Sequence, residues 1–402
     1  MIELFFGVAL AVIIAWLVGQ RSRLRLRARV ELVAVVLGIL LAGAYVVAKR
    51  FAGGLGAVTA LNDQFPWGLW ITFDLCGVAL AAGGFLVAGT VHLFHLRRFE
   101  PVLRPTILTS LIAYQLVAAV LVLDLGRPQR FWHPLILWQP HSVMFEITLC
   151  LSLYTVVLAG EFSPALFEKF GWSGPAATLR RLNLPLVLLG VILSTLHQSS
   201  FGSLFLIVPE KLHPLWYTPW LPVLFLVSAA AAGLAMVIVE SALCARFLGR
   251  RLPPAILEDL GRACRVVLWV YLALRVGDVV WRQAWTAAGH PWWLGASFVV
   301  ELVGGALLPA LWLGRAAADG RPRPLVPAAL LVIGGVVLHR VNISWWALLP
   351  ATGASYAPTW MEWMVTLALV ALGILAFLAV AAFLPVFAAG EDPPAPRTPL
   401  RV

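Results

Sequence analysis

Long apolar runs alternate with short polar connections along the whole chain. Most runs are about 20 residues long, the length that one α-helix needs to cross the hydrocarbon core of a bilayer. A membrane β-barrel would instead show shorter segments of alternating polarity. The pattern therefore predicts an all-α fold, a polytopic transmembrane bundle of 10–11 helices. Eleven runs support this prediction: residues 2–19, 32–48, 67–95, 105–123, 142–160, 184–208, 219–243, 266–286, 293–314, 325–347 and 359–387.

The same pattern divides the chain into three parts. Residues 1–31 are predicted to form an additional N-terminal transmembrane helix and a basic cytoplasmic loop. Residues 32–389 form the main transmembrane domain, and residues 390–402 form a short Pro-rich cytoplasmic tail. The first run is short enough for a signal peptide, but no basic segment precedes it and no small-residue cleavage site follows. We therefore expect a retained helix.

Composition excludes a soluble globular protein. Hydrophobic residues make up 61% of the chain and charged residues 12%, and the mean hydropathy is +0.91. A soluble domain cannot bury that much apolar surface. The net charge of +10 does not require a nucleic-acid partner, because anionic lipid headgroups attract basic residues beside membrane helices. We expect membrane lipids as partners of these charges, and no nucleic acid.

The basic residues favour one orientation in the membrane. Most of the 29 Lys and Arg residues fall in every second connection, including the cluster from Arg21 to Arg29. Connections rich in basic residues stay in the cytoplasm. This rule places the C-terminus on the cytoplasmic side of a bacterial inner membrane. It places the segment DLGRPQRFWHP, residues 124–134, on the outer face.

Neither the cysteines nor the histidines show the spacing of a cofactor-binding motif. The four cysteines include no CxxC pair, so we expect no iron–sulfur cluster in this chain. Only His197 and His339 lie well inside apolar runs. The runs that contain these two histidines are far apart in the sequence, so they offer one possible ligand pair rather than a repeated set of haem ligands. We therefore expect no haem, and the spacing of possible ligands predicts no metal site.

Ionisable residues inside the apolar runs are the strongest functional signal, because each costs about 2.5–3.5 kcal/mol near the centre of a membrane helix. At about 1.5 Å per residue, Asp74 lies about 10 Å inside its run. Glu146 lies about one turn inside its run, and His197 two to three turns. Asp124 lies at an outer end. Such groups at similar depth suit proton transfer, although each alone could be a structural hydrogen-bonding residue.

Further ionisable residues have structural explanations. Arg275 and Asp278 are three residues apart, so they can pair on one face of a helix. Glu362, one turn into the last run, is expected to be interfacial. Glu240 and Glu301 could line an inner proton half-channel with that pair, or could be structural, and the sequence leaves both interpretations open.

Five segments resemble one known family. They are FPWGLWITFDL, LDLGRPQRFWHP, NLPLVLLGVILSTLHQSSFGSL, KLHPLWY and YAPTWMEWMVTLALVA. They resemble the NrfD/PsrC family of quinone-reactive membrane subunits, and most closely the HybB-type membrane subunits of hydrogenase-2-type NiFe hydrogenases. The likeness runs from about Val46 to Phe387. The additional first run departs from the HybB pattern, so the side on which the N-terminus lies stays open.

The resemblance implies a function in respiratory electron transfer. The resemblance implies a protein without haem that binds menaquinone or ubiquinone near the periplasmic side of the membrane. A periplasmic ferredoxin-like iron–sulfur subunit docks there, and the NiFe hydrogenase small and large subunits lie beyond it. This chain would be the quinone-binding subunit of a hydrogen:quinone oxidoreductase, without hydrogenase activity of its own. Its partners would then carry the electrons.

Quinone reduction consumes two electrons and two protons, which gives each candidate residue a role. Asp74 and Glu146 would donate protons, since burial favours the protonated form of a carboxyl group. His197 would bond a quinone carbonyl and transfer a proton. The other candidates would bind the quinone. Trp70 and Phe73 would lie beside the quinone ring, and Gln198 would lie beside His197. By resemblance, Asp124 and Arg127 would lie at the mouth of the pocket or at the subunit interface.

Two other functions fit the sequence less well. The chain could be the same type of anchor in a polysulfide, nitrite or other sulfur-compound oxidoreductase, because the sequence does not identify the catalytic partner. A secondary transporter would belong to a different class. Such folds usually show inverted repeats and helices interrupted at matching positions, and neither is evident here.

Overall fold

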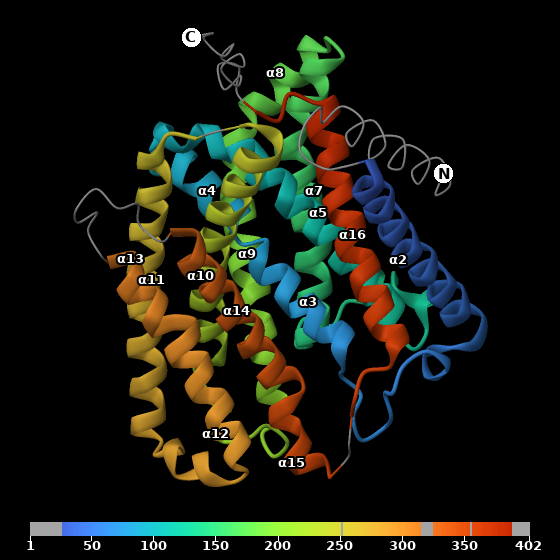
Figure 1. Ribbon diagram of the computed structural model, residues 1–402, viewed down its shortest axis with the longest axis vertical. Helices are drawn as coiled ribbons and strands as arrows, with labels where there is room; N and C mark the ends of the chain where they lie inside the picture. Colours follow the sequence, from blue (N-terminus) through green and yellow to red (C-terminus); the bar gives the residue numbers. More distant parts are fainter. Residues whose placement is uncertain (1–25, 251, 315–324, 354–355, 388–402) are drawn as a thin grey trace.

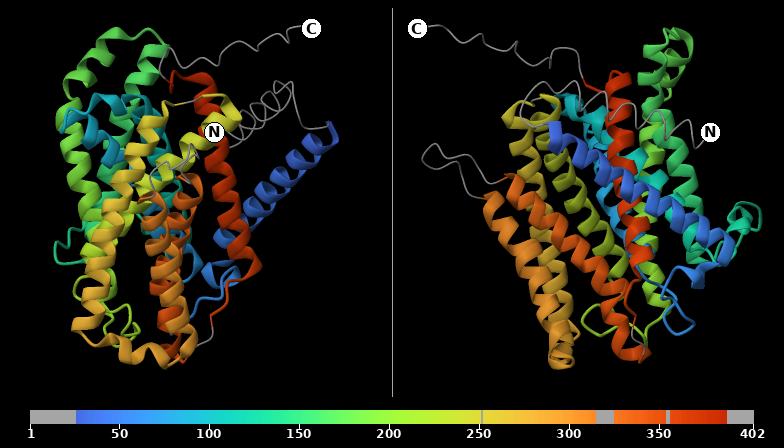
Figure 2. Two further views of the ribbon diagram at one scale, coloured as in Figure 1. Left: turned by 60° about the vertical axis from the view of Figure 1, so that its left-hand side comes forward. Right: turned by 45° about the vertical axis from the view of Figure 1, so that its right-hand side comes forward.

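The chain folds into a bundle of long helices that run roughly along one axis (Figures 1 and 2). The computed structural model describes residues 26–250, 252–314, 325–353 and 356–387, and this part of the chain is helical with no strand. The predicted all-α transmembrane bundle is confirmed. The helices that build the bundle are α2 Leu26–Gly53, α3 Leu69–Leu80, α4 Gly83–His92, α5 Glu100–Asp124, α7 Val143–Lys169, α9 Asn183–Leu204, α10 Leu221–Leu243, α11 Pro254–Trp281, α12 Trp292–Val299, α13 Leu308–Gly314, α14 Leu325–Ser344 and α16 Trp360–Phe383.

Ten of the eleven predicted runs coincide with helices of the structure. Nine helical spans within the described residues are long and apolar enough to cross a membrane. The run at residues 266–286 corresponds to α11, which is 28 residues long but carries more charge. The predicted helix at residues 2–19 and the tail at residues 390–402 lie outside the described residues.

Shorter helices mark the two ends of the bundle. In Figure 1, α8, Ser173–Arg181, lies at the upper end, and α15, Leu349–Thr352, lies at the lower end. We call the α15 end the outer end and the α8 end the inner end, as the charge pattern predicts. A further short helix, α6, His133–Ile136, lies in the connection between α5 and α7.

Helix α10 occupies the centre, because it packs against α3, α4, α9, α11 and α14. Small side chains allow this close approach, as is usual between membrane helices. A methyl group on Gly233 of α10 would meet the backbone nitrogen of Gly83 at 2.5 Å. Helices α2 and α16 pack together on one side of the bundle, blue and red in Figure 1.

The structure corrects the prediction of one continuous helix at residues 67–95. The helix is interrupted at Ala81 and Ala82, between α3 and α4. Side chains from neighbouring helices bond the carbonyl groups there: the Gln198 amide donates to Val78 O at 2.8 Å and the Ser110 hydroxyl donates to Ala81 O at 2.7 Å. Interrupted helices are tolerated in membranes when such bonds satisfy the backbone. The apolar pattern therefore did not predict this interruption.

A second irregularity follows α12. Residues Val300–Leu307 form a π-helical segment, η7, that joins α12 to α13. Gly305 of this segment lies against Gly335 of α14, where a methyl group on either would approach the other's Cα to 2.3 Å. π-Helical segments are frequent at functional sites, and this one contains the buried carboxylate of Glu301.

Candidate functional sites at the outer side

A cluster of acidic groups lies at the outer end of α3, α5 and α16. Asp74 of α3 is 1% exposed, and its Oδ1 atom has no hydrogen-bond partner. It interacts electrostatically with Asp124, which ends α5 and also has an oxygen atom without a partner. Asp124 interacts in turn with Glu362. Neighbouring carboxylates repel when all are ionised, so this arrangement favours holding a proton.

Arg50 provides the buried positive charge beside this cluster. Its guanidinium group is 2% exposed on α2 and donates to the carbonyl groups of Leu123, at 2.7 Å, and Leu125. These carbonyls belong to the C-terminal turn of α5, where backbone acceptors lack helical partners and attract cations. Arg50 therefore fixes the end of α5 and interacts with Asp124. The sequence showed Arg50 only as a basic residue of an outer connection.

Glu362 is buried rather than interfacial, which corrects the expectation. It is 1% exposed and forms a capping box with Thr359 at the start of α16. Its carboxylate also accepts bonds from the backbone nitrogen of Ala60, at 3.1 Å, and from the Tyr356 hydroxyl. Trp70 donates to the Glu362 carbonyl at 3.2 Å. The T-x-x-E pattern in TWME was the signal for the cap, but no local pattern shows the bond to Ala60.

Tyr356 joins the connection before α16 to the start of α3. Its hydroxyl donates to Glu362 and accepts from the backbone nitrogen of Leu69 at 2.8 Å. Burial, with the bond to Glu362, raises the pKa of this hydroxyl, so it remains a donor at neutral pH. Sequence reasoning did not single out Tyr356, because tyrosine beside a helix end is ordinarily part of an aromatic belt.

His197 lies beside Tyr114, deeper in the bundle. Its ring is 0% exposed, neither ring nitrogen has a partner, and it packs against Tyr114 and Phe201 with centroid distances of 5.6 and 4.7 Å. Tyr114 also interacts electrostatically with Asp74. Tyr114 thus interacts with both Asp74 and His197. Gln198 instead bonds the interruption between α3 and α4.

The other predicted site residues differ in how close they come to this cluster. Trp70 is buried and Phe73 is half-buried on α3, next to Asp74 in sequence. Glu146 is half-buried in the first turn of α7, and none of the hydrogen bonds or ion pairs found among the described residues joins it to Asp74 or His197. Arg127 is exposed in the connection after α5.

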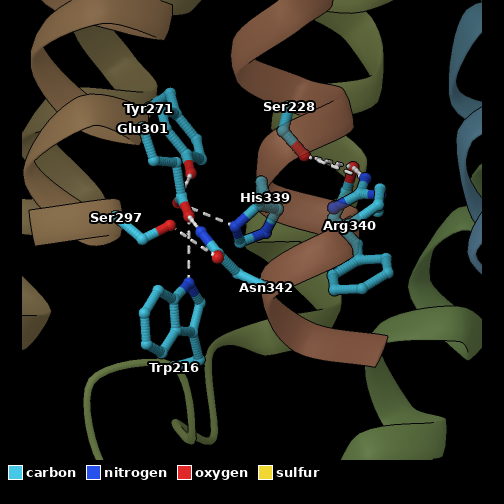
Figure 3. A network of polar contacts seen from close by, with 9 residues as sticks. Trp216, Ser228, Tyr271, Ser297, Glu301, His339, Arg340 and Asn342 are labelled. Atoms are coloured by element: carbon cyan, nitrogen blue, oxygen red, sulfur yellow. Dashed lines mark hydrogen bonds and ion pairs between the residues drawn. The ribbon is translucent and has the colours of Figure 1, made fainter. Parts of the chain in front are cut away.

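A second polar network surrounds Glu301 (Figure 3). The carboxylate is 2% exposed and accepts bonds from four side chains on three other segments. The donors are Trp216 Nε1 at 3.0 Å, Asn342 Nδ2 at 2.8 Å, His339 Nδ1 at 2.8 Å and the Tyr271 hydroxyl at 3.3 Å. Ser297 donates to Asn342 Oδ1 at 2.8 Å.

The structure identifies the partners of Glu301 and Asp278. Glu301 bonds Trp216 and Asn342 and also lines a cavity beside His339, so its structural and proton-conducting interpretations both stay open. Asp278 pairs with Arg282 at 2.7 Å, whereas we expected its partner to be Arg275. The Arg275 guanidinium lies over the Phe298 ring at 5.0 Å, and all three of its nitrogen atoms lack hydrogen-bond partners.

Comparison with known proteins identifies relatives that cover most of this chain. The family profile described as "Polysulphide reductase, NrfD" matches residues 57–352. A chain from Nitratidesulfovibrio vulgaris, named only as a protein, is 38% identical over 368 residues, 88% of this chain and 93% of its own. The "Probable Ni/Fe-hydrogenase 2 b-type cytochrome subunit" of Escherichia coli K12 is 34% identical over 349 residues, 85% of this chain and 88% of its own.

A third relative is named for a quinone. The "Menaquinone reductase, integral membrane subunit" of Nitratidesulfovibrio vulgaris is 29% identical over 377 residues, 86% of this chain and 88% of its own. The two informative names thus describe membrane subunits of oxidoreductase complexes.

The name of the E. coli relative contradicts our expectation of no haem, because a b-type cytochrome is a haem protein. That expectation was wrong and is withdrawn. The two most buried histidines, His197 and His339, each keep a ring nitrogen without a partner, as an axial ligand requires. The rings packed against His197, and the cavity of ≈ 280 Å³ beside His339, do not fit a haem macrocycle as these side chains stand. We therefore derive no step through haem.

Proposed function

Because the chain belongs to the NrfD family, we propose that it is the quinone-binding membrane subunit of a respiratory NiFe hydrogenase. It passes electrons between a periplasmic ferredoxin-like iron–sulfur subunit and menaquinone or ubiquinone, with coupled proton uptake. The name of the E. coli relative supports the hydrogenase partner, and the name of the menaquinone reductase relative supports the quinone. The proposed location is the bacterial inner membrane, with the C-terminus in the cytoplasm.

The observation that carries the quinone site is the buried Asp74 carboxyl group with an oxygen atom that has no partner. A buried polar atom without a partner costs about 1–3 kcal/mol. Such a cost is maintained where a ligand or proton supplies the missing partner. Trp70 and Phe73 on the same helix are the proposed aromatic neighbours of the quinone ring.

The reduction of the quinone forms two O–H bonds. Two electrons come from the iron–sulfur subunit, and Asp74 gives one proton to a quinone oxygen and is then protonated again through Asp124. His197 donates a hydrogen bond to the other carbonyl oxygen and transfers the second proton, while its other ring nitrogen takes up a proton so that the ring stays neutral. Gln198 holds the helix interruption beside it. Glu146 is retained as an additional proton donor at the start of α7. Arg127 is proposed to contact the docked subunit, because it is exposed beside Asp124 at the outer end.

A different catalytic partner is the second candidate. The family profile itself is named for polysulphide reductase, so an anchor of a sulfur-compound oxidoreductase would use the same outer site with other subunits. The two candidates differ in the proteins that copurify with this chain. Isolation of the intact complex from its native membrane, followed by identification of the subunits by mass spectrometry, distinguishes them.

Replacement of the proton donors tests the quinone site. We expect Asp74→Asn, Glu146→Gln and His197→Gln each to lower hydrogen-to-quinone turnover by about 10²-fold, the scale of general acid–base catalysis. Hydrogen oxidation with an artificial dye should continue, because the dye takes electrons before they reach this subunit. Assembly in the membrane should also be retained.

The matched control is Glu240→Gln. Glu240 is a buried carboxylate of α10 that lines a separate cavity of ≈ 300 Å³ toward the inner end, so its replacement should change quinone turnover much less. Normal turnover in all three outer variants would place the quinone elsewhere in the subunit.

A further inference from the structure

A second ionisable pair lies away from the outer acidic cluster, among α10, α11, α14 and the π-helical segment η7. His339 Nδ1 bonds Glu301 Oε1 at 2.8 Å, and both side chains are almost fully buried. Figure 3 shows His339 on α14 pointing toward Glu301 on the facing segment. A histidine that is oriented by a carboxylate at one nitrogen is suited to exchange a proton at the other.

The second ring nitrogen of His339 is free for that exchange. Nε2 is buried and has no hydrogen-bond partner. Because Glu301 accepts the Nδ1 proton, the neutral ring carries an unshared electron pair at Nε2. The pair on Nε2 is therefore the acceptor in this network that can bind an additional proton.

His339 also lines a small cavity. The cavity, of ≈ 280 Å³, lies on the side of the network toward the inner end, since its walls continue inward along each helix. They run from Ser228 to Ala231 on α10, from Tyr271 to Leu268 on α11, from Glu301 to Ala306 on η7, and from His339 to Gly335 on α14. The ≈ 280 Å³ includes space open to solvent, and the enclosed part beside these polar groups has room for about one ordered water molecule.

The charges around the pair select a proton rather than a metal cation. The Glu301 carboxylate already accepts four hydrogen bonds, which occupies its acceptor sites. Two buried guanidinium groups, Arg275 and Arg340, interact electrostatically with Glu301 and His339. They repel any added positive charge, so they oppose a divalent metal ion more strongly than a single proton paired with the carboxylate. The neutral Tyr271 hydroxyl is the remaining titratable group that faces the pair.

This network is joined to the proposed quinone site through α14 and α3. The Ser344 hydroxyl bonds Thr72 at 2.7 Å, two residues before Asp74, and donates to the Arg340 carbonyl at 2.6 Å. Arg340 and Asp74 also both interact electrostatically with Cys76. Arg340 is therefore linked to α3 through Ser344 and Thr72, and it is next to His339 on α14.

We propose that His339 and Glu301 form a proton-binding site, distinct from the quinone pocket, that is loaded through the inner cavity. Water in the cavity delivers a proton from the inner side, an N–H bond forms at Nε2, and the imidazolium ion is paired with Glu301. No electron is exchanged in this step. The coupling to quinone rests on the proposed function: reduction takes protons from the outer cluster, and loading of His339 compensates that charge change. When the outer cluster is protonated again, the His339 proton leaves toward the outer side, and Nε2 is free for the next cycle.

The proton-binding site can be tested without any quinone chemistry. The full-length chain is labelled with ¹⁵N-histidine and placed in lipid nanodiscs, and the imidazole nitrogen signals are followed from about pH 4 to 9, the range in which histidines titrate. We expect one signal, absent in His339→Gln, that changes from an unprotonated to a protonated Nε2. Glu301→Gln should lower its midpoint by more than about one pH unit, because the counter-charge is removed.

Glu240→Gln is the matched control, a buried carboxylate outside the network, and should leave this signal unchanged. A His339 signal that stays unprotonated throughout, or an equal response to Glu240→Gln, would overturn the proposal. Glu301→Gln identifies the signal independently if His339→Gln does not fold.

Coupling is tested with the whole complex in proteoliposomes that contain menaquinone. For wild type, hydrogen oxidation should generate a membrane potential during quinone reduction. His339→Gln and Glu301→Gln should lower the potential generated per quinone reduced by at least about fivefold, with Glu240→Gln as the control. An unchanged ratio in both variants would reject the coupling. Absence of quinone reduction in wild type would instead reject the proposed function and leave the nitrogen titration standing.

Discussion

At the residue scale, buried ionisable side chains distinguish this bundle from a simple membrane anchor. Asp74 and His197 were recognisable from the sequence because a charged or polar group in an apolar run has a free-energy cost of membrane insertion that the run itself reveals. The roles of Glu362 and Arg50 were not recognisable, because their partners lie far away in the chain. Ala60 is 302 residues from Glu362, and Leu123 is 73 residues from Arg50. Burial and partners of that kind depend on tertiary packing, which no local pattern encodes.

His213 gives a prediction on pH at this scale. Its Nε2–H donates to the His290 carbonyl at 3.1 Å, and its Nδ1 accepts from the backbone nitrogen of Leu215 at 3.3 Å. Burial lowers the pKa of His213, since the charged form is desolvated and would lose the Nδ1 bond. Because the folded-state pKa lies below the unfolded value of about 6.5, its stabilising contribution is present above that value. The contribution is lost as pH falls through the folded-state value.

Thermal unfolding of the purified chain in detergent, measured between about pH 8 and pH 4.5, checks this prediction. The wild type should lose more stability on acidification than His213→Asn, in which an amide replaces the titrating ring. Parallel curves for the two proteins would show that His213 does not couple folding to pH.

At the scale of the elements, the positions of the helices were predictable and their irregularities were not. Apolar length alone located the ten helical runs that the structure describes, since every spanning segment must cover the same hydrocarbon thickness. The interruption at Ala81 and the π-helical segment η7 both lie against other helices. Ser110 and Gln198 bond the backbone at the interruption, and Gly305 of η7 lies against Gly335 of α14.

The glycine contact leads to a prediction with an internal control. A methyl group on Gly305 would lie 2.3 Å from the Cα atom of Gly335, a backbone atom that cannot move aside cheaply. Gly305→Ala should therefore separate η7 from α14 and lower the unfolding temperature by several degrees, with loss of the His339 nitrogen signal. The neighbouring Gly334 has no atom within 4 Å of an added methyl group.

Gly334→Ala should consequently behave like wild type in both measurements. An equal loss in both variants would mean that helix propensity or insertion, rather than the glycine contact, determines the outcome.

At the scale of the whole molecule, α15 and the starts of α12 and α16 lie at one end of the bundle (Figure 1). The outer cluster is built from α2, α3, α5 and α16, and the Glu301 network from α10, α11, α12 with η7, and α14. The bond between Thr72 and Ser344 joins the two halves. The function proposed for either site therefore depends on which compartment faces this end.

Reporter fusions determine that orientation. A phosphatase reporter, active only in the periplasm, should be active after insertion in the connection at residues 351–357 and inactive after Val402. The physical reason is the clustering of Lys and Arg in the alternate connections, which resist transfer across the membrane. A fluorescent reporter that matures only in the cytoplasm should give the opposite pattern at the same two sites. If the 351–357 fusion is cytoplasmic, Asp74 lies near the cytoplasm, and a periplasmic iron–sulfur subunit cannot be its electron donor.

A third fusion, placed before Ile2, locates the N-terminus. A periplasmic result supports the predicted membrane helix at residues 2–19. A cytoplasmic result contradicts that helix and leaves the orientation of α2 to α16 unaffected.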